Sequence, residues 1–245
     1  MLLIRDLIAA PSSRATPVLN GVSLEVNRGE KVAILGPSGT GKTTLFRTIT
    51  GFVPVRSGTV SVDGVSVQGL HGQHLREWRR RIALVSQRHD LVERLRVHQN
   101  VMAGALGRWS TLHALRFLLF PLAAELEEAR TALDRVEIAH KLRASTSELS
   151  GGEHQRVAIA RALVQQPLVL LADEPVASLD PHLSEQILAL LCRLAKENGF
   201  ALLCSLHQPE FAYRYFDRII RIKDGRVLAD ERLSAARGKI IGVGA

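Results

Sequence analysis

The sequence predicts an α/β protein built on a parallel β-sheet, with an antiparallel β layer and an inserted helical lobe. An apolar run at 31–35 is followed by a glycine-rich loop and a helical stretch at 44–49, which is the usual opening of a parallel α/β sheet. Two further apolar runs, 168–172 and 200–204, each follow a helical segment, as buried parallel strands do. Residues 97–146 have helical periodicity, and we expect no strand there.

The expected antiparallel layer lies before about Val67. Residues 22–26 and 60–67 alternate with period two, and the Asp63-Gly64 pair inside the second run is a strong signal for a two-residue hairpin turn. Another Asp-Gly pair, at 224–225, predicts a last hairpin over 218–230. The chain therefore begins with antiparallel strands and ends with a hairpin and a short tail.

A length of 245 residues, of which 46% are hydrophobic, is ample for a buried core and excludes a disordered chain. We expect one domain over 1–245. In it, 1–90 and 150–245 form the β layer and the α/β core, and 91–149 form the helical lobe. Because the sequence stops soon after the last hairpin, we expect no added regulatory domain and no ligand-controlled inhibition within this chain.

Composition also bears on the cellular setting. Two cysteines cannot form a disulfide framework, and we expect a reducing compartment and no export signal. The apolar window at 112–122 is shorter than the roughly 20 residues of a membrane span, so any membrane association is expected to be peripheral. The formal net charge of +8 favours anionic partners: nucleotide phosphates, nucleic acid or a lipid surface.

The glycine-rich loop after 31–35 fits the phosphate-binding (P-loop) pattern in full. Its glycines let several backbone N–H groups point at one anion, and the helix that follows adds its positive dipole end. Lys42 can reach the β- and γ-phosphates, and the Thr43 hydroxyl can ligate Mg²⁺. The alternative is a glycine-rich turn with a solvated lysine. The residues expected to bind the phosphates are Gly36, Pro37, Ser38, Gly39, Thr40, Gly41, Lys42, Thr43 and Thr44.

Two carboxylates follow the apolar run at 168–172. We expect Asp173 to hold magnesium through water, and Glu174 to orient and deprotonate the water that attacks the phosphate. The alternative is an acidic pair that caps a helix. Pro175 and the presence of a phosphate loop in the same chain argue against that alternative.

The segment Leu149 to Glu153 contains two adjacent glycines. Ser150 and Glu153 form a capping box for a helix that we expect from Gly151 to about Val164. A capping box needs neither glycine, whereas close approach of bare backbone to a phosphate needs both.

Six motifs in this order resemble the ABC ATPase family over nearly the whole chain. They are the phosphate loop, Gln87 after the strand 82–86, the signature at 149–153, Asp173-Glu174, Ser178-Leu179-Asp180, and His207 after the strand ending at Leu206. The resemblance implies a RecA-like ABC ATPase core, ATP as substrate and Mg²⁺ as cofactor.

The resemblance also implies roles for residues outside the phosphate loop. Gln87 would contact Mg²⁺ and the attacking water and sense a membrane partner, and His207 would contact the γ-phosphate. Ser150, Gly151 and Gly152 would bind ATP held by a second copy of the chain, with Asp180 crossing between the subunits. Two ATP molecules would thus lie between two copies. A lone glutamine at a strand end or a lone histidine would otherwise be an ordinary structural residue.

The chain departs from the family where adenine is bound. The usual stacking aromatic residue would fall among Ser12, Ser13 and Arg14, and no aromatic residue occurs before Phe46. We expect adenine to lie on Arg14 or on an apolar side chain such as Val18, with loose selectivity for the base.

A closer resemblance is to the ATP-binding subunits of bacterial phosphonate importers. It rests on 91–95 with Asn100-Val101, on 104–111, and on 172–181. It implies membrane-spanning permease subunits, indirectly a periplasmic or extracellular solute-binding protein, and a peripheral position at the cytoplasmic face of the cell membrane.

Three other functions stay open on the sequence alone. An importer for another solute is compatible with a generic helical hairpin in the lobe. A soluble ABC ATPase acting on nucleic acid is suggested by the +8 charge, but we expect no nucleic-acid partner because this chain has one ATPase half and a compact lobe. A small-molecule kinase would leave the signature at 149–153 without a role.

Overall fold

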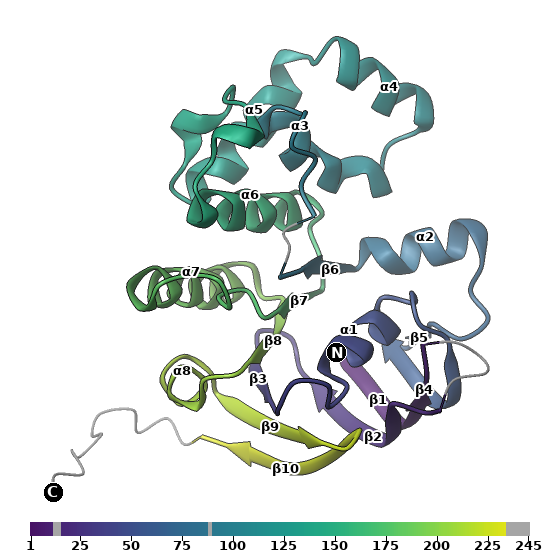
Figure 1. Cartoon of the computed structure of the whole chain (residues 1–245). Coiled ribbons are helices and arrows are strands. Elements are labelled where there is room, and N and C mark those ends of the chain that lie inside the picture. Colours follow the sequence, from purple (N-terminus) through teal and green to yellow (C-terminus); the bar gives the residue numbers. More distant parts are fainter. Residues whose placement is uncertain (12–15, 88–89, 234–245) are drawn as a thin grey trace, which may run out of the picture.

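The computed structural model describes residues 1–11, 16–87 and 90–233. Two β-sheets form the lower part of the molecule in Figure 1, and most of the helices lie above them. The mixed α/β architecture, with its antiparallel layer and its helical part, confirms the predicted fold class.

The first sheet is antiparallel and has the strand order β2-β1-β4-β5. Its strands are β1 (Leu2–Ala9), β2 (Leu19–Val26), β4 (Val55–Val62) and β5 (Val65–Ser66). Asp63 and Gly64 join β4 to β5 with φ values of 48° and 78°. Positive φ at both positions is the requirement of a type I′ turn, so the predicted Asp-Gly hairpin is confirmed.

The second sheet has the order β10-β9-β3-β8-β7-β6 and is parallel except for its edge strand β10. Its strands are β3 (Lys31–Leu35), β6 (Ile82–Val85), β7 (Val169–Asp173), β8 (Ala201–Leu206), β9 (Arg218–Lys223) and β10 (Arg226–Arg232). Every residue of β7 and β8 is buried. The continuous apolar runs therefore form central parallel strands, as predicted.

The core is accompanied by five α-helices: α1 (Lys42–Ile49), α2 (Gly72–Arg80), α6 (Gly151–Val164), α7 (Pro181–Asn198) and α8 (Pro209–Tyr215). Between Val97 and Thr146, all of which the structure describes, every named element is helical. These elements are α3 (Val97–Met102), α4 (Thr111–Leu119), α5 (Ala123–Arg135) and the short 3₁₀ helices η1 (Ala103–Gly107), η2 (Ala139–Lys141) and η3 (Thr146–Glu148).

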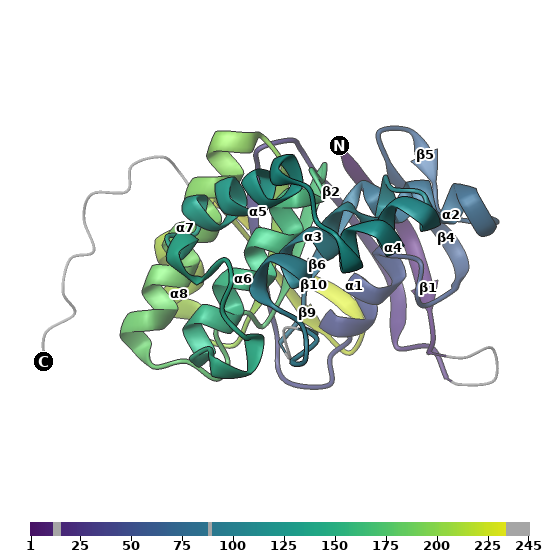
Figure 2. The same ribbon diagram turned by 90° about the horizontal axis from the view of Figure 1, so that it is seen from above.

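Helix α6 connects the helical lobe to the core. It contacts α3 and α5 on one side and α7 and β6 on the other, and Figure 2 shows α3, α5 and α6 lying close together when seen from above. The exact lobe limits at 91 and 149 stay a prediction.

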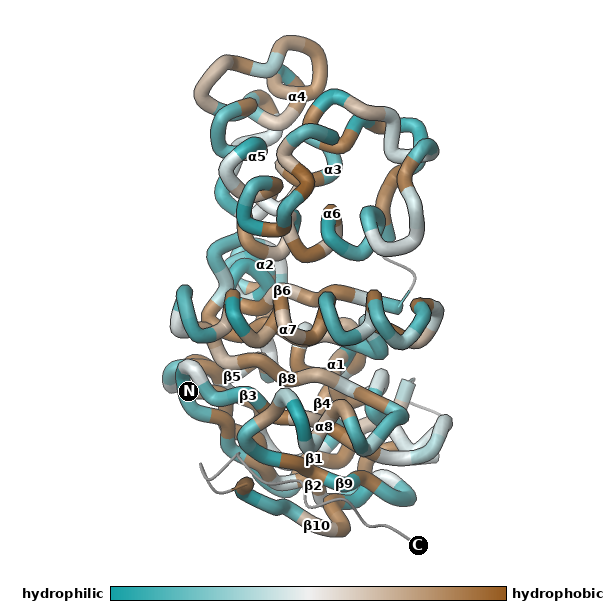
Figure 3. The backbone as a smooth tube through the Cα atoms, turned by 90° about the vertical axis from the view of Figure 1, so that its left-hand side faces the viewer, coloured by the Kyte–Doolittle hydropathy of each residue, from teal (hydrophilic) through white to brown (hydrophobic). Residues whose placement is uncertain are grey.

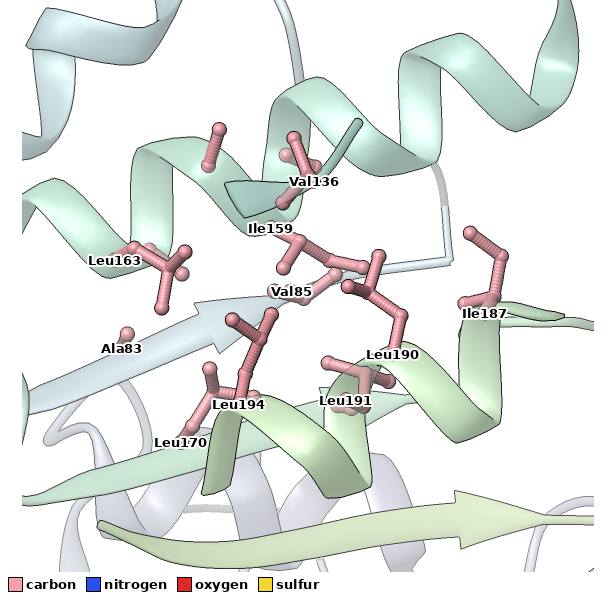
Figure 4. Packing of buried hydrophobic residues seen from close by; sticks show 14 of the residues in the cluster. Ala83, Val85, Val136, Ile159, Leu163, Leu170, Ile187, Leu190, Leu191 and Leu194 are labelled. Atoms are coloured by element: carbon pink, nitrogen blue, oxygen red, sulfur yellow. The ribbon is translucent and has the colours of Figure 1, made fainter. Parts of the chain in front are cut away.

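Apolar packing holds these layers together. Figure 4 shows Ile159 of α6 and Leu190 and Leu194 of α7 pointing into one cluster, with Leu170 of β7 below them. Figure 3 shows apolar and polar residues alternating along α7, as expected for a helix with one buried face. Within the described ranges, no helix combines the length and the apolar character needed to cross a membrane.

One largely buried carboxylate joins α4 to the start of α5. The Glu125 oxygens accept from the Leu122 backbone N–H at 2.8 Å and from Arg116, and His113 Nε2 lies 2.7 Å away. Burial acts to raise the pKa of Glu125, but the hydrogen bonds from Arg116, Leu122 and His113 outweigh it and hold the pKa at about 2.

We predict that Glu125→Gln lowers the free energy of unfolding by about 2 kcal/mol at pH 7, because charge-assisted hydrogen bonds are lost. The pKa of Glu125 is depressed, so its stabilisation is full above the ordinary value of 4.5 and is lost as the pH falls toward about 2. Urea unfolding at several pH values measures the difference between wild type and variant, which should shrink across this range. The control is Glu127→Gln, whose exposed carboxylate lies 3.9 Å from Arg130; equal losses in both variants would contradict the prediction.

Candidate functional site

The candidate site lies at the carboxyl ends of the parallel strands β3, β7 and β8. Leu35 of β3 pairs with Leu206 of β8, and Asp173 of β7 pairs with Ser205 of β8. The phosphate loop follows β3, Glu174 follows β7, and His207 follows β8. Ligands of open parallel sheets bind at this edge.

The loop's geometry fits an anion. Gly41, with φ 104°, is the N-cap of α1, and no side chain caps the first turn of this helix, which has no acidic residue. The first-turn N–H groups of α1 therefore have no side-chain acceptor there. Position 36 needs glycine because the loop passes close to the backbone of β9. A Cβ there would lie 2.3 Å from the Ile222 backbone oxygen.

Lys42 is buried beneath this loop, with only 4% of its surface exposed. Its Nζ donates to the backbone oxygens of Gly36 at 2.7 Å and Pro37 at 3.0 Å, and it lies 3.8 Å from a Glu174 oxygen. Burial lowers the pKa of the Lys42 ammonium, while the nearby carboxylates of Glu174 and Asp173 oppose this shift. A buried cation within an uncapped loop suits a phosphate ligand.

Ser205 contacts both acidic residues, and it was not among the residues predicted from the sequence. Its hydroxyl donates to Asp173 Oδ1 at 2.7 Å and accepts from the Glu174 backbone N–H at 2.8 Å. Ser205 is fully buried. Its one local signal is a hydroxyl inside the otherwise apolar run of β8.

Glu174 and His207 come together as an acid–imidazole pair. His207 Nε2 lies 2.7 Å from Glu174 Oε1, and the two residues line a cavity of about 150 Å³ with Leu179, Gln208 and Phe211. Glu174 has φ 50°, a left-handed conformation that is unfavourable for a residue with a side chain. Backbone strain of this kind clusters at functional sites.

Thr43 belongs to the phosphate loop, and the other predicted site residues lie at the surface in other segments. Gln87 and Thr43 are exposed; Ser150 is the exposed N-cap of α6, and Asp180 is the exposed N-cap of α7, accepting from the Leu183 N–H at 3.0 Å. Among the contacts of the described residues, no hydrogen bond or ion pair joins Gln87, Ser150 or Asp180 to the phosphate loop. The observed contacts join Lys42, Glu174 and His207, with Asp173 linked to Glu174 through Ser205.

The structure changes the interpretation of the signature glycines. The capping box is present: Ser150 N donates to Glu153 at 2.8 Å, and the Ser150 hydroxyl accepts from the Glu153 N–H at 3.4 Å. A Cβ at Gly152 would lie 2.6 Å from Leu183 Cδ2, so packing on α7 already favours glycine there. A Cβ at Gly151 would meet nothing closer than 3.7 Å, so Gly151 is the glycine without an internal packing reason.

Part of the predicted adenine site lies outside the described residues, namely Ser12, Ser13 and Arg14. Val18 is described and is half-buried beside the loop. A Cβ at Gly41 would lie 3.3 Å from Val18 Cγ1, which places this apolar side chain next to the phosphate-binding backbone.

Known proteins resemble this chain in sequence and in structure. The family model described as ABC transporter matches residues 19–177. The phosphonates import ATP-binding protein PhnC 1 of Pseudomonas syringae pv. tomato is 45% identical over 218 residues, covering 89% of this chain and 82% of that protein. PhnC 2 of Haloarcula marismortui, with the same description, is 41% identical over 226 residues, covering 91% and 83%.

Among solved structures, the dimeric structure of MJ0796, described as a bacterial ABC transporter cassette, matches with a TM-score of 0.81 and 30% identity. The match covers 96% of this chain and all of that chain. A second structure of MJ0796, described as a post-hydrolysis state bound to ADP and Pi, matches with a TM-score of 0.79 and 31% identity.

We predict that Ser205→Ala lowers kcat for nucleotide hydrolysis by about tenfold to a hundredfold, because the Asp173 carboxylate and the Glu174 backbone N–H lose their shared hydrogen-bond partner. The KM for nucleotide should stay within about twofold, since the phosphate loop is untouched. Steady-state kinetics measure both constants. The control is Cys204→Ala, a buried change in the same strand; the prediction is wrong if the two variants show the same kcat.

Proposed function

The chain belongs to the ABC transporter family, and on that premise we propose that it is the ATP-hydrolysing subunit of an importer for phosphonates or phosphate esters. The observation that supports the substrate class is the set of relatives described as phosphonates import ATP-binding proteins, 41–46% identical over most of the chain. ATP hydrolysis in this chain would drive transport through separate permease subunits. The chain is accordingly membrane-associated, and we place it peripherally at the cytoplasmic face of the cell membrane.

ATP would bind with its phosphates on the loop from Gly36 to Thr44. The uncapped first turn of α1 donates backbone N–H groups, and Lys42 shifts its Nζ donors from the loop carbonyls to the β- and γ-phosphates. The exposed Ser38 and Gly39 leave the outer side of the loop open to the nucleotide.

Mg²⁺ would be held beside the loop by three oxygen-bearing side chains: the Thr43 hydroxyl, the Gln87 amide and Asp173, the last through water. Mg²⁺ in nucleotide sites is held by one or two carboxylates together with phosphate oxygens and water, so a single acid suffices. When bound, the ion supplies charge that stabilises the phosphates during transfer. Ser205 orients Asp173 for this task through its 2.7 Å hydrogen bond.

Glu174 is the proposed general base. Its carboxylate would orient a water molecule and accept its proton as the water oxygen bonds to the γ-phosphorus and the bond to ADP breaks. His207 Nε2 lies 2.7 Å from Glu174 Oε1, and in this proposal it would hold that carboxylate and contact the γ-phosphate.

A second copy of the chain would complete each site. Gly151 is exposed at the start of α6, so its backbone N–H group would face a phosphate on another chain, with the exposed Ser150 side chain beside it. The exposed Asp180 would cross between the copies. The likeness to the dimeric MJ0796 cassette supports this arrangement.

The permease would dock in the groove between α2 and η1. Cavities of about 270 and 520 Å³ lie there, and arginines line them: Arg76, Arg79, Arg80 and Arg108. Such a groove suits an acidic segment of a partner, or the carboxyl end of a partner helix, which is the negative end of the helix dipole. A periplasmic or extracellular solute-binding protein would deliver the substrate to the permease, and nucleic acid has no part in this function.

We predict that Glu174→Gln lowers the ATPase kcat by about a hundredfold to ten-thousandfold and traps a dimer in ATP and Mg²⁺, because the base is lost while the phosphate contacts remain. Size-exclusion chromatography with light scattering measures the dimer. The control is Glu210→Gln, an exposed carboxylate in the first turn of α8. A Glu174→Gln variant that stayed monomeric with ATP would oppose the two-copy mechanism.

The substrate class is tested in liposomes that contain the chain and its permease, with the solute-binding protein outside. We predict that the binding protein stimulates ATP hydrolysis when loaded with a phosphonate such as methylphosphonate, because closure of the dimer follows docking of the loaded protein. The empty binding protein and one mixed with sulfate are the controls. Stimulation by an unrelated solute, and not by any phosphonate or phosphate ester, would assign the chain to a different importer.

A further inference from the structure

The segment that follows Gln87 is fixed to the helical lobe at two points. Arg161 of α6 donates from Nη1 to the backbone oxygen of Asp90 at 2.7 Å. Val92 lies two residues after Asp90, and Asn100 of α3 binds both of its backbone polar groups. The Asn100 Oδ1 accepts from the Val92 N–H, and Nδ2 donates to the Val92 oxygen, each at 2.9 Å. One side chain thus makes the pair of bonds that a neighbouring strand would make.

The Asn100 amide also contacts the segment that leads into α6. Its Nδ2 donates to Thr146 Oγ1 at 2.9 Å. Thr146 is fully buried and precedes Ser150, the N-cap of α6, by only one short 3₁₀ turn. Asn100 itself is 2% exposed and makes three of the four hydrogen bonds that an amide can make.

Backbone hydrogen bonds hold the same two segments together. Thr146 N donates to the Leu95 oxygen at 3.2 Å, and Val97 N donates to the Ala144 oxygen at 3.1 Å. Arg96 and Ser145 form an isolated antiparallel bridge between these bonds. Residues 95–97 and 144–146 are therefore held together at this place, and the Asn100 side chain adds a connection from Val92 to Thr146.

We propose that Asn100 is a positioning residue that fixes the spacing between Gln87 and the Ser150 end of α6. The inference rests on the proposed function, in which Gln87 serves the nucleotide of its own chain and Ser150 the nucleotide of the second copy. Because one planar amide binds Val92 and Thr146 together, a shift of α6 moves the Val92 backbone with it. Asn100 in this way makes the two nucleotide-facing motifs move as a unit.

A purely structural role for Asn100 is the alternative, and the chain offers a matched control for it. His98 lies on the same helix, is 7% exposed, and has its Nδ1 3.1 Å from the Leu142 backbone oxygen. Its hydrogen bond ties α3 to the segment before Thr146 without touching Val92. Loss of the His98 bond therefore tests general lobe packing, and loss of the Asn100 bonds tests the connection to Gln87.

The experiment compares steady-state ATP hydrolysis of Asn100→Leu, Thr146→Val, the double variant and His98→Leu with the wild type. Asn100→Leu removes all three bonds at similar volume, and we expect kcat to fall about tenfold or more while the KM for ATP stays within about twofold. Thr146→Val keeps both bonds to Val92 and should lower kcat less. The double variant should match Asn100→Leu, because their shared bond can be lost only once.

His98→Leu should lower the thermal unfolding midpoint and leave kcat close to that of the wild type. The inference is overturned if Asn100→Leu and Thr146→Val both keep the wild-type kcat, or if His98→Leu lowers kcat as much as Asn100→Leu does. If Asn100→Leu does not fold, the kcat of Thr146→Val is compared with that of His98→Leu. The inference is then overturned if Thr146→Val keeps the wild-type kcat or if His98→Leu lowers kcat as much. A wild-type chain without ATP hydrolysis would instead overturn the proposed function together with this inference.

Discussion

The hydrogen-bond register of three parallel strands is the constraint on which the site depends. Pairing of Asp173 with Ser205 puts the Ser205 hydroxyl within reach of the carboxylate and places Glu174 opposite the start of the turn that contains His207. A slip of one residue would turn Asp173 to the other face of the sheet. Both faces of β7 and β8 are buried in apolar packing, so the same burial that stabilises the core also fixes the chemistry at its edge.

Positive charge serves the structure as well as the proposed ligands. Arg76 donates to the backbone oxygens of Leu106 and Trp109, and Arg79 donates to those of Thr50 and Gly51. Arg218 lies between Glu30 and Asp230, whose hydrogen bonds raise its pKa well above the ordinary value. In the sequence, the net charge of +8 favoured anionic partners, yet several of these arginine side chains join neighbouring segments of the chain.

Features that depend on a few adjacent residues were predicted well. The Asp-Gly pairs at 63–64 and 224–225 predicted turns because these residues tolerate the positive φ that both positions have. The capping box predicted the start of α6. The loop between β3 and α1 was predictable because its glycines mark the turn from strand to helix, and its binding of phosphate stays a prediction. Ser205 and Asn100 had no such signal, because a hydroxyl in a strand and an amide in a helix acquire a role only from what lies opposite.

The sequence by itself determined the family and the α/β core with its glycine-rich loop, since these are local patterns of spacing and turn chemistry. Only the tertiary structure decided that Ser205 anchors both Asp173 and the Glu174 backbone, that Gly152 packs closely on Leu183, and that Asn100 links Val92 to Thr146. The physical reason is that each of these contacts joins segments brought together by strand order and helix packing. Residues that are far apart along the chain become neighbours only in the fold, so the sequence alone does not show that they are in contact.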